Sequence, residues 1–215
     1  MFSRRLIGLA CGVSVLVLAL GSGAFASTLN QVVQPSGTVY GQGYPYYLQQ
    51  VWTKYFSSAS FCQTVTVNGR KVALAEDYKS GRSTCTVSAG EPIFINSLST
   101  ECSNLPGQHN GWGTSDSDLQ KCSRAVTEKA LITEWLDGQR VANFGKIFWK
   151  SVPAFTASVS PGRFSGVSAT SARAAAWGWS LLLNGLPKGT HTVKCKATYP
   201  SGGTEFASTV TLKVQ

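Results

Sequence analysis

The feature that most constrains this chain is an export signal at its start, followed by five cysteines. Arg4 and Arg5 precede an apolar run over residues 6–20, and Ala24-Phe25-Ala26 fits the small-x-small pattern of a signal-peptide cleavage site. We therefore expect residues 1–26 to be removed and the mature chain to be secreted or periplasmic. Cysteines form structural disulfides in such oxidising compartments, so we expect the fold to contain them.

Four mature cysteines, Cys62, Cys85, Cys102 and Cys122, are candidates for two disulfides. Their order favours pairing of neighbours, 62 with 85 and 102 with 122, while the other connectivities stay open from sequence. Cys195 lies in a segment of alternating polar and apolar residues, which indicates a buried thiol with the packing role of a small apolar side chain. A reactive thiol or an intermolecular bridge is the alternative for Cys195. The cysteines and histidines lack zinc-site spacing, so we predict no metal and no cofactor.

Residue patterns predict many strands and two short helices. Tyr44–Ser57 has the apolar spacing of an amphipathic helix, and Ser115 or Asp116 is suited to begin a second helix. Asn68-Gly69 and Asp137-Gly138 each separate two strand-like segments and predict two-residue hairpin turns. The expected strands cover residues 64–67, 70–74, 83–88, 92–98, 131–136, 140–144, 146–150, 153–158, 175–183, 190–199 and 204–214.

Together these elements predict an all-β fold. Residues 27–43 are polar and contain glycine, which indicates an extended N-terminal lead-in. Residues 44–215 are expected to form a single domain, a disulfide-bearing antiparallel β-sandwich that is jelly-roll-like and includes the two helices. A long polar loop is expected over residues 99–116, and Ser201-Gly202-Gly203 is expected to turn the last hairpin.

Several segments together resemble an uncharacterised family of secreted bacterial proteins. The residues that carry the resemblance are Trp52, Thr84-Cys85-Thr86-Val87-Ser88-Ala89-Gly90, Pro92-Ile93-Phe94-Ile95, Glu101-Cys102-Ser103, Leu136-Asp137-Gly138 and Leu186-Pro187-Lys188-Gly189-Thr190-His191-Thr192-Val193. The resemblance covers most of residues 40–215 and implies a jelly-roll-like exported domain. It implies no established activity, so it assigns no functional residue.

The charge balance gives a first indication of partners. The formal net charge is +9, of which two charges belong to Arg4 and Arg5 in the signal. A basic exported protein attracts anionic partners, such as an acidic glycan or another envelope component. The basic residues are scattered and form no long run, which favours the alternative of a merely soluble surface with a positive excess, and we predict no specific nucleic-acid partner. No second apolar run is long enough to span a bilayer, so we predict no transmembrane segment after signal removal.

Carboxylates and histidines suggest an enzyme as one alternative. Two acids on either side of a sugar linkage hydrolyse glycosidic bonds, so Glu101 with Asp116 or His109 is the candidate set for a secreted glycan hydrolase or lyase. The competing interpretation assigns Asp116 and Asp118 to the start of a helix and Glu101 to a solvated or capping role. The chain has no Gly-x-Ser-x-Gly nucleophile elbow, and we predict no catalytic residue.

Aromatic residues favour binding instead. Tyr44, Tyr46 and Tyr47 are grouped at the start of the first helix, and Trp112 lies between two glycines in the polar loop beside His109. Sugar rings stack on such aromatic faces, so these five residues are the predicted ligand-binding set. The leading hypothesis is a noncatalytic exported protein that binds a carbohydrate or an envelope or matrix component. A structural protein that pairs with partners through its edge strands is a further alternative.

Overall fold

The computed structural model describes residues 28–58, 60–76, 81–109, 111–200 and 206–215. The predicted signal peptide and the Ser201-Gly202-Gly203 turn lie outside the described residues. The helices are η2 (Leu29–Gln31, a 3₁₀ turn), α1 (Tyr44–Ser57), α2 (Asp116–Thr127) and α3 (Phe144–Ile147). The strands are β1 (Cys62–Val67), β2 (Arg70–Glu76), β3 (Gly81–Val87), β4 (Ile93–Ser103), β5 (Leu131–Leu136), β6 (Gln139–Arg140), β7 (Trp149–Ser158), β8 (Ser171–Leu183), β9 (Gly189–Thr198) and β10 (Phe206–Val214).

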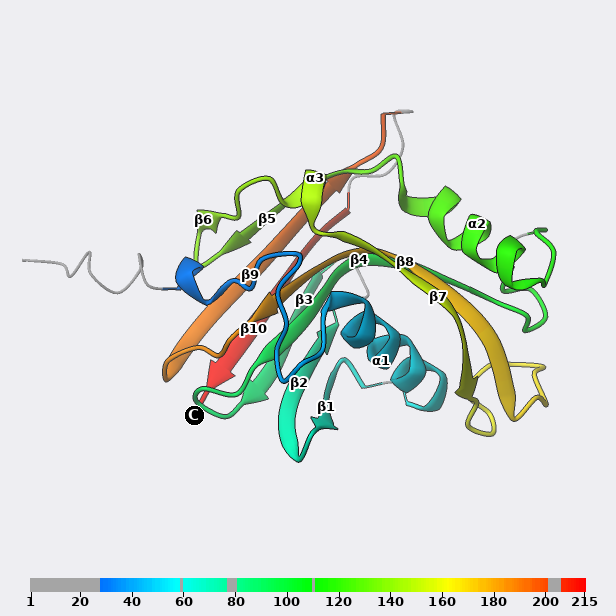
Figure 1. Ribbon diagram of the computed structural model, residues 1–215, viewed down its shortest axis with the longest axis horizontal. Helices are drawn as coiled ribbons and strands as arrows, with labels where there is room; N and C mark the ends of the chain where they lie inside the picture. Colours follow the sequence, from blue (N-terminus) through cyan, green and yellow to red (C-terminus); the bar gives the residue numbers. More distant parts are fainter. Residues whose placement is uncertain (1–27, 59, 77–80, 110, 201–205) are drawn as a thin grey trace, which may run out of the picture.

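The strands form two five-stranded sheets around a shared apolar core (Figure 1). The first sheet has the order β1-β2-β4-β8-β7 and the second sheet has the order β3-β10-β9-β5-β6. The prediction of a mainly β fold in two layers is confirmed, but the expectation of wholly antiparallel pairing is wrong. Strands β2 and β4 pair in parallel, as do β3 and β10, because β3 leaves the first sheet and joins the edge of the second. The jelly-roll-like arrangement stays a prediction.

Local sequence signals placed several elements correctly. Helix α1 has the predicted bounds, with Pro45 in its first turn, where the missing N–H costs no intrahelical bond. Asn68 and Gly69 have φ values of 49° and 77°, the left-handed conformation that a type I′ turn requires at both central residues. Asp137 and Gly138 repeat this geometry, with φ values of 49° and 78°.

Both predicted disulfides are present and join neighbouring cysteines. Cys62–Cys85 connects β1 of the first sheet to β3 of the second, with the two Cα atoms 5.3 Å apart. Cys102–Cys122 connects β4 to helix α2. Cys195 belongs to neither disulfide and is fully buried on β9, as predicted for a thiol that packs like a small apolar residue.

Two regions differ from the predicted elements. Strand β4 continues to Ser103, so Glu101 lies within a strand and not in a polar loop. A short helix, α3, replaces a strand expected near residue 146, and β6 has only two residues. Tertiary contacts determine this second difference, because Trp179 Nε1 donates to the Gly145 carbonyl at 3.0 Å and fixes α3 against the first sheet.

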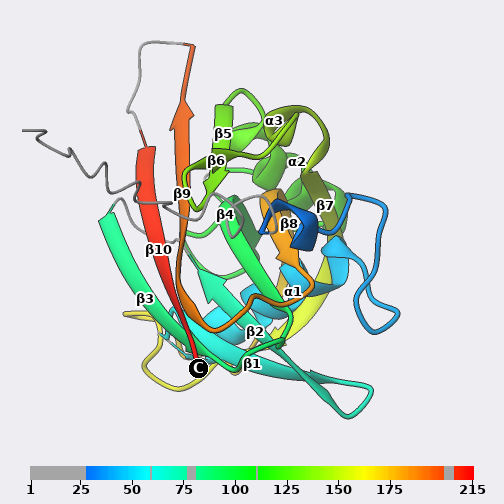
Figure 2. The same ribbon diagram turned by 90° about the vertical axis from the view of Figure 1, so that its left-hand side faces the viewer.

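Helices α1 and α2 pack against opposite faces of the first sheet. Trp52 of α1 donates from Nε1 to Ser99 Oγ at 3.0 Å, whereas Cys122 of α2 is bonded to Cys102. Successive residues of a strand point to opposite faces, so these two contacts place the helices on different sides of β4. The second sheet lies on the same side of the first sheet as α2 (Figures 1 and 2).

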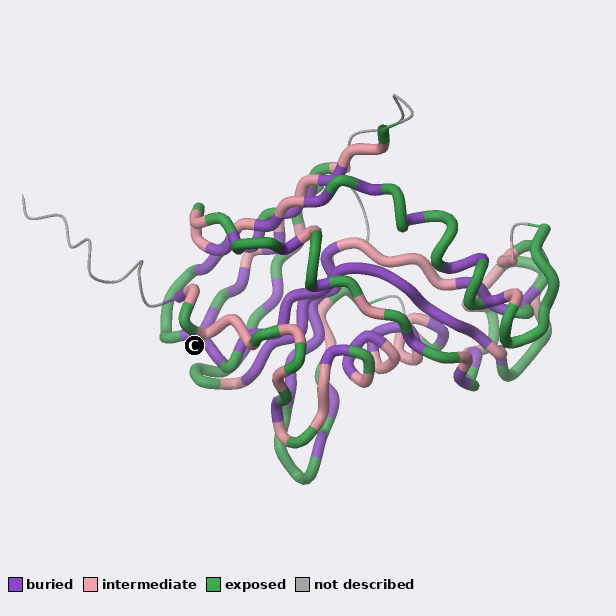
Figure 3. Tube along the Cα trace, turned by 45° about the horizontal axis from the view of Figure 1, so that its top comes forward, coloured by how far each residue is buried: buried purple, intermediate pink, exposed green. Residues whose placement is uncertain are grey.

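The buried residues run through the middle of both sheets, and the exposed ones lie in the connections and on the outer sides of strands and helices (Figure 3). Strand β8 is buried along nearly its whole length because it has a helix or the second sheet over each face. Among the described residues, no helix is long and apolar enough to cross a membrane.

Candidate functional site

The predicted tyrosine cluster lies mostly in the core. Tyr44 and Tyr47 are 0 % exposed, and their hydroxyls donate to the Val33 and Val39 carbonyls at 2.5 and 2.7 Å. Burial raises the pKa of Tyr47 to about 12. The expectation that these two rings present a stacking surface is therefore wrong, because packing leaves no face for a ligand. Tyr46 is half-buried, with its ring edge-on to that of Tyr47.

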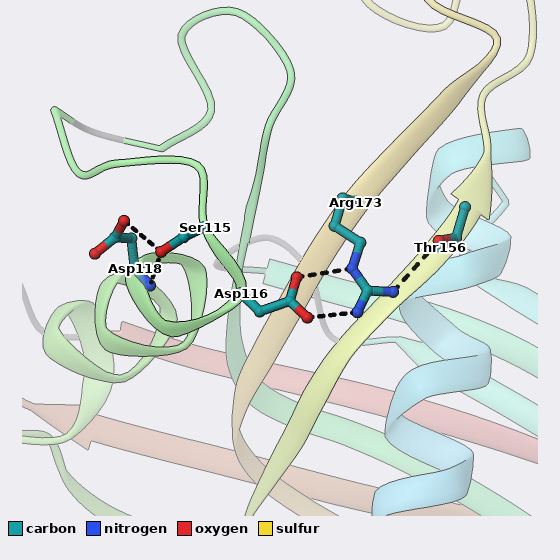
Figure 4. Close-up of polar contacts among 5 residues, drawn as sticks. All are labelled: Ser115, Asp116, Asp118, Thr156 and Arg173. Carbon is teal, nitrogen blue, oxygen red and sulfur yellow. Dashed lines mark hydrogen bonds and ion pairs between the residues drawn. The ribbon is translucent and has the colours of Figure 1, made fainter.

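Glu101 and Asp116 lie on opposite sides of the first sheet. Cys102 faces α2 through its disulfide, so the preceding Glu101 points to the side that α1 covers. Asp116 is on the α2 side, where it binds Arg173 with contacts of 2.8 and 2.6 Å (Figure 4). This arrangement does not bring the two carboxyl groups together across one sugar linkage.

Each of these acids has a structural environment of its own. Hydrogen bonding to Arg173 holds the pKa of Asp116 below its usual value. Burial raises the pKa of Glu101 to about 7, an effect that nearby Ser103 partly offsets. Ser115 caps α2 by accepting from the Asp118 backbone N–H at 3.2 Å, which is the role that the sequence predicted for a residue at this position (Figure 4).

His109 and Trp112 are close neighbours at the start of α2. The Trp112 backbone N–H donates to the His109 carbonyl at 2.8 Å, and the Trp112 side chain is 40 % exposed. His109 is half-buried and lies beside Cys122, whose Sγ is 3.4 Å from the His109 carbonyl oxygen. These two residues therefore lie on the α2 side of the first sheet, away from the tyrosines of α1.

A more extensive polar surface lies on the outer face of the second sheet. We call it the threonine–cation face and define it by the outward-pointing side chains of β3, β10, β9, β5 and β6. Its cations are Arg82, Arg140, Lys194, Lys196 and Lys213, and its threonines are Thr84, Thr86, Thr133, Thr190, Thr192, Thr198, Thr209 and Thr211. Leu131, Trp135 and Ala207 complete it.

The strand register aligns five of these side chains in a single row across the whole sheet. Arg82 pairs with Thr209, Thr209 with Lys194, Lys194 with Trp135, and Trp135 with Arg140. Paired residues on neighbouring strands point to the same face. We call this row of five residues the cation row. Lys194 Nζ lies 5.9 Å from the centre of the Trp135 ring, so a cation and an aromatic ring are neighbours at the middle of the cation row.

Two hollows open on this face, one on each side of Trp135. The first has a volume of about 690 Å³, and its lining includes Lys146 and Lys196, with Leu131 among its apolar residues. Gly145 closes one wall, where an added Cβ would lie 2.7 Å from the Ile132 carbonyl oxygen, so glycine allows α3 to approach β5. The second hollow measures about 320 Å³ and is lined by Trp135, Gly138, Thr192, Lys194 and Thr209.

The electrostatics of this face favour anions. No outward-pointing side chain of the described parts of these five strands is a carboxylate. Asp137, at the adjacent hairpin, is turned away to His191 Nδ1 at 2.7 Å and to the Thr192 backbone N–H at 2.8 Å. Among their described residues, the outer surface of these five strands therefore has cations and no acid.

The threonine–cation face was not among the predicted sites, although part of its signal is visible in the sequence. The alternation over residues 190–198 shows Lys194 and Lys196 on the polar side of one strand. The alignment with Arg82 and Arg140 depends on strand order, which local alternation does not determine. Among the described residues, no group of three His, Cys, Asp or Glu side chains is arranged to hold a metal ion.

Comparison with known proteins finds no matching family model and no matching curated protein. Among solved structures, the chain is similar to the cysteine protease inhibitor EhICP2 from Entamoeba histolytica, with 12 % identity and a TM-score of 0.26, over 67 % of this chain and 96 % of that one. It is also similar to Amebosin, with 11 % identity and a TM-score of 0.24, over 66 % of this chain and 96 % of that one. Similarities this weak support no inference about fold or function.

Proposed function

We propose that this protein is exported and binds an anionic glycan or envelope component, without catalysis, through the threonine–cation face. The observation that carries the proposal is the cation row, which aligns three cations with a tryptophan and a threonine on a surface whose described strand residues include no outward-pointing carboxylate. The two disulfides fit an oxidising compartment, which supports secretion or a periplasmic location.

The chemistry of the face suits an acidic sugar better than a neutral ligand. Lysine and arginine bind carboxylate or sulfate groups, the Trp135 ring supplies a stacking surface, and threonine hydroxyls donate to and accept from sugar hydroxyls. The adjoining hollows of about 690 and 320 Å³ provide recesses for groups that project from a ligand chain.

Binding without turnover is the activity that this surface supports best. Glycoside hydrolysis uses two carboxyl groups on either side of the scissile bond, and the face presents none among its described side chains. The hydrolase alternative requires Glu101 with Asp116 or His109, and both of these partners lie on the α2 side of the first sheet, opposite Glu101.

The test is a titration of the mature protein with acidic polysaccharides and with the same polymers after reduction of their carboxyl groups. We expect the acidic forms to bind and the reduced forms to bind far more weakly, with affinity falling as salt increases because exposed charges are screened. Equal affinity for acidic and reduced polymers would refute an anionic ligand. Release of reducing ends during incubation would show catalysis instead.

Matched variants locate the surface. Lys194→Gln and Arg140→Gln each remove one cation from the face, and exposed ion pairs contribute about 0.2–1 kcal/mol, so each should weaken binding by up to about fivefold. Lys121→Gln removes the same charge from an exposed position on α2 and should leave affinity unchanged. An equal loss in all three variants would show that net charge, and not this face, determines binding.

A further inference from the structure

We propose that the ligand is a linear polysaccharide with an acid group on every second sugar, and that it lies across the strands along the cation row. This inference rests on the proposed function, because it specifies the ligand of the same face. It follows from the spacing of the cations, not from their number.

The cation row alternates charged and uncharged side chains. In the strand order β3-β10-β9-β5-β6, the row has Arg82 on β3, Lys194 on β9 and Arg140 on β6. Thr209 on β10 and Trp135 on β5 lie between them. Neighbouring strands are about 4.8 Å apart, so successive cations start from backbone positions about 10 Å apart.

This period matches a chain of extended sugar rings. One pyranose unit of a β-linked chain has a length close to one strand spacing, so successive sugars meet successive strands. Acid groups on alternate sugars then face Arg82, Lys194 and Arg140. The neutral sugars between them meet the Thr209 hydroxyl and the ring of Trp135, which provide a hydrogen bond and a stacking surface.

The same period disfavours a nucleic acid. Each strand of a duplex carries one phosphate per about 3.4 Å of helix axis, which is much denser than the charges of this row. The row ends at Arg140, which also lines the larger hollow. Since β6 is the edge strand of the sheet, affinity should rise with ligand length until about five sugars fill the row.

The experiment compares hexasaccharides of equal length and different charge density by calorimetric titration of the mature protein. Hyaluronan and chondroitin hexasaccharides have an acid on alternate sugars, whereas a galacturonate hexamer has one on every sugar. Charge attraction alone makes the galacturonate hexamer the tighter ligand. If the proposal is correct, the hyaluronan or the chondroitin hexasaccharide, which have acids on alternate sugars, binds about fivefold more tightly than the galacturonate hexamer.

Two variants test the position of the chain. Lys194→Gln, at the centre of the row, should weaken the alternating hexasaccharide by about fivefold. Lys213→Gln lies on the same face but pairs with Thr86 and Thr190, outside the row, and should weaken binding less than Lys194→Gln does. An equal loss in both variants would refute the assignment to the row.

The outcomes separate this inference from the proposed function. Tighter binding of the galacturonate hexamer, or of a single-stranded oligonucleotide of equal charge, would refute alternation. Binding of acidic polymers without binding of either alternating hexasaccharide would refute it as well, and an anionic glycan would remain the ligand class. If acidic polymers bind no better than their reduced forms, the proposed function itself fails.

Discussion

Tyr44→Phe removes a single oxygen atom from the core and tests whether the first helix is held by its hydroxyl. The Tyr44 hydroxyl donates to the Val33 carbonyl at 2.5 Å and accepts from the Leu182 backbone N–H at 3.1 Å. It therefore joins the N-terminal segment, α1 and β8 at one point. The ring contacts with Phe94 and Phe148, at centroid distances of 6.2 and 6.0 Å, remain in the variant.

The expected cost follows from the two backbone groups that lose a partner. A buried polar group left without a hydrogen bond costs about 1–3 kcal/mol, so we expect Tyr44→Phe to lower the free energy of unfolding by about 3 kcal/mol. For a chain of this size, this change lowers the melting temperature by roughly 6–12 °C. Burial raises the pKa of Tyr44 above its ordinary value, so the hydroxyl stays protonated and able to donate over the working pH range.

Urea unfolding followed by circular dichroism measures this loss, with Tyr46→Phe as the matched control. Tyr46 is half-buried, and its hydroxyl makes no hydrogen bond with another described residue, so its removal should change stability by less than about 0.5 kcal/mol. If Tyr44→Phe and Tyr46→Phe have the same unfolding free energy, the hydroxyl does not hold the helix in the way the geometry indicates. Both variants should bind acidic glycans like the wild type, because neither residue belongs to the threonine–cation face.

Two further predictions concern crosslinking and protonation. The Cys62–Cys85 disulfide joins residues 23 positions apart, so replacing both with serine should lower the free energy of unfolding by about 3 kcal/mol, and an unchanged urea midpoint would contradict this. Burial raises the pKa of Glu101 to about 7, above the ordinary value of 4.5, so the folded chain holds this proton more tightly than the unfolded chain. The contribution of Glu101 to the free energy of unfolding should therefore be fully present below pH 4.5, decrease as the pH rises to 7 and then stay constant. Glu101→Gln should remove the part of the decline that Glu101 causes and should be more stable than the wild type at pH 8. Glu76, whose pKa burial raises to about 8, should still lower the stability of the variant as the pH rises. If the variant and the wild type lose stability identically with pH, groups other than Glu101 cause the decline.

The elements that the sequence predicted well depend on short-range chemistry. Helix α1 begins where Pro45 is tolerated, and its apolar residues recur with the helical period. The turns at Asn68-Gly69 and Asp137-Gly138 require positive φ at two successive residues, and few dipeptides adopt this at low cost. Neighbouring cysteines paired as expected because their strands and helix lie side by side.

The elements that the sequence predicted poorly depend on partners far away in the chain. Ser99, Glu101 and Ser103 are polar and resemble a loop, yet they continue β4 and point to the side of the first sheet that α1 covers. The register also shifts between Asn96 and Leu98, which breaks the alternation that would have extended the predicted strand. Local polarity therefore indicated exposure at a position where tertiary packing imposes burial.

The candidate site was hidden for the same reason, since it exists only in the register between strands. Arg82 and Arg140 lie in segments that never pair with each other, and β10 and β9 bring them into one row. Within each strand, however, the period of two separates core from surface, so Val193 is buried while Lys194 is exposed. Substitution of Lys194 therefore alters the face without removing a core contact. A loss of glycan affinity in Lys194→Gln, measured with an unchanged free energy of unfolding, belongs to the face and not to the fold.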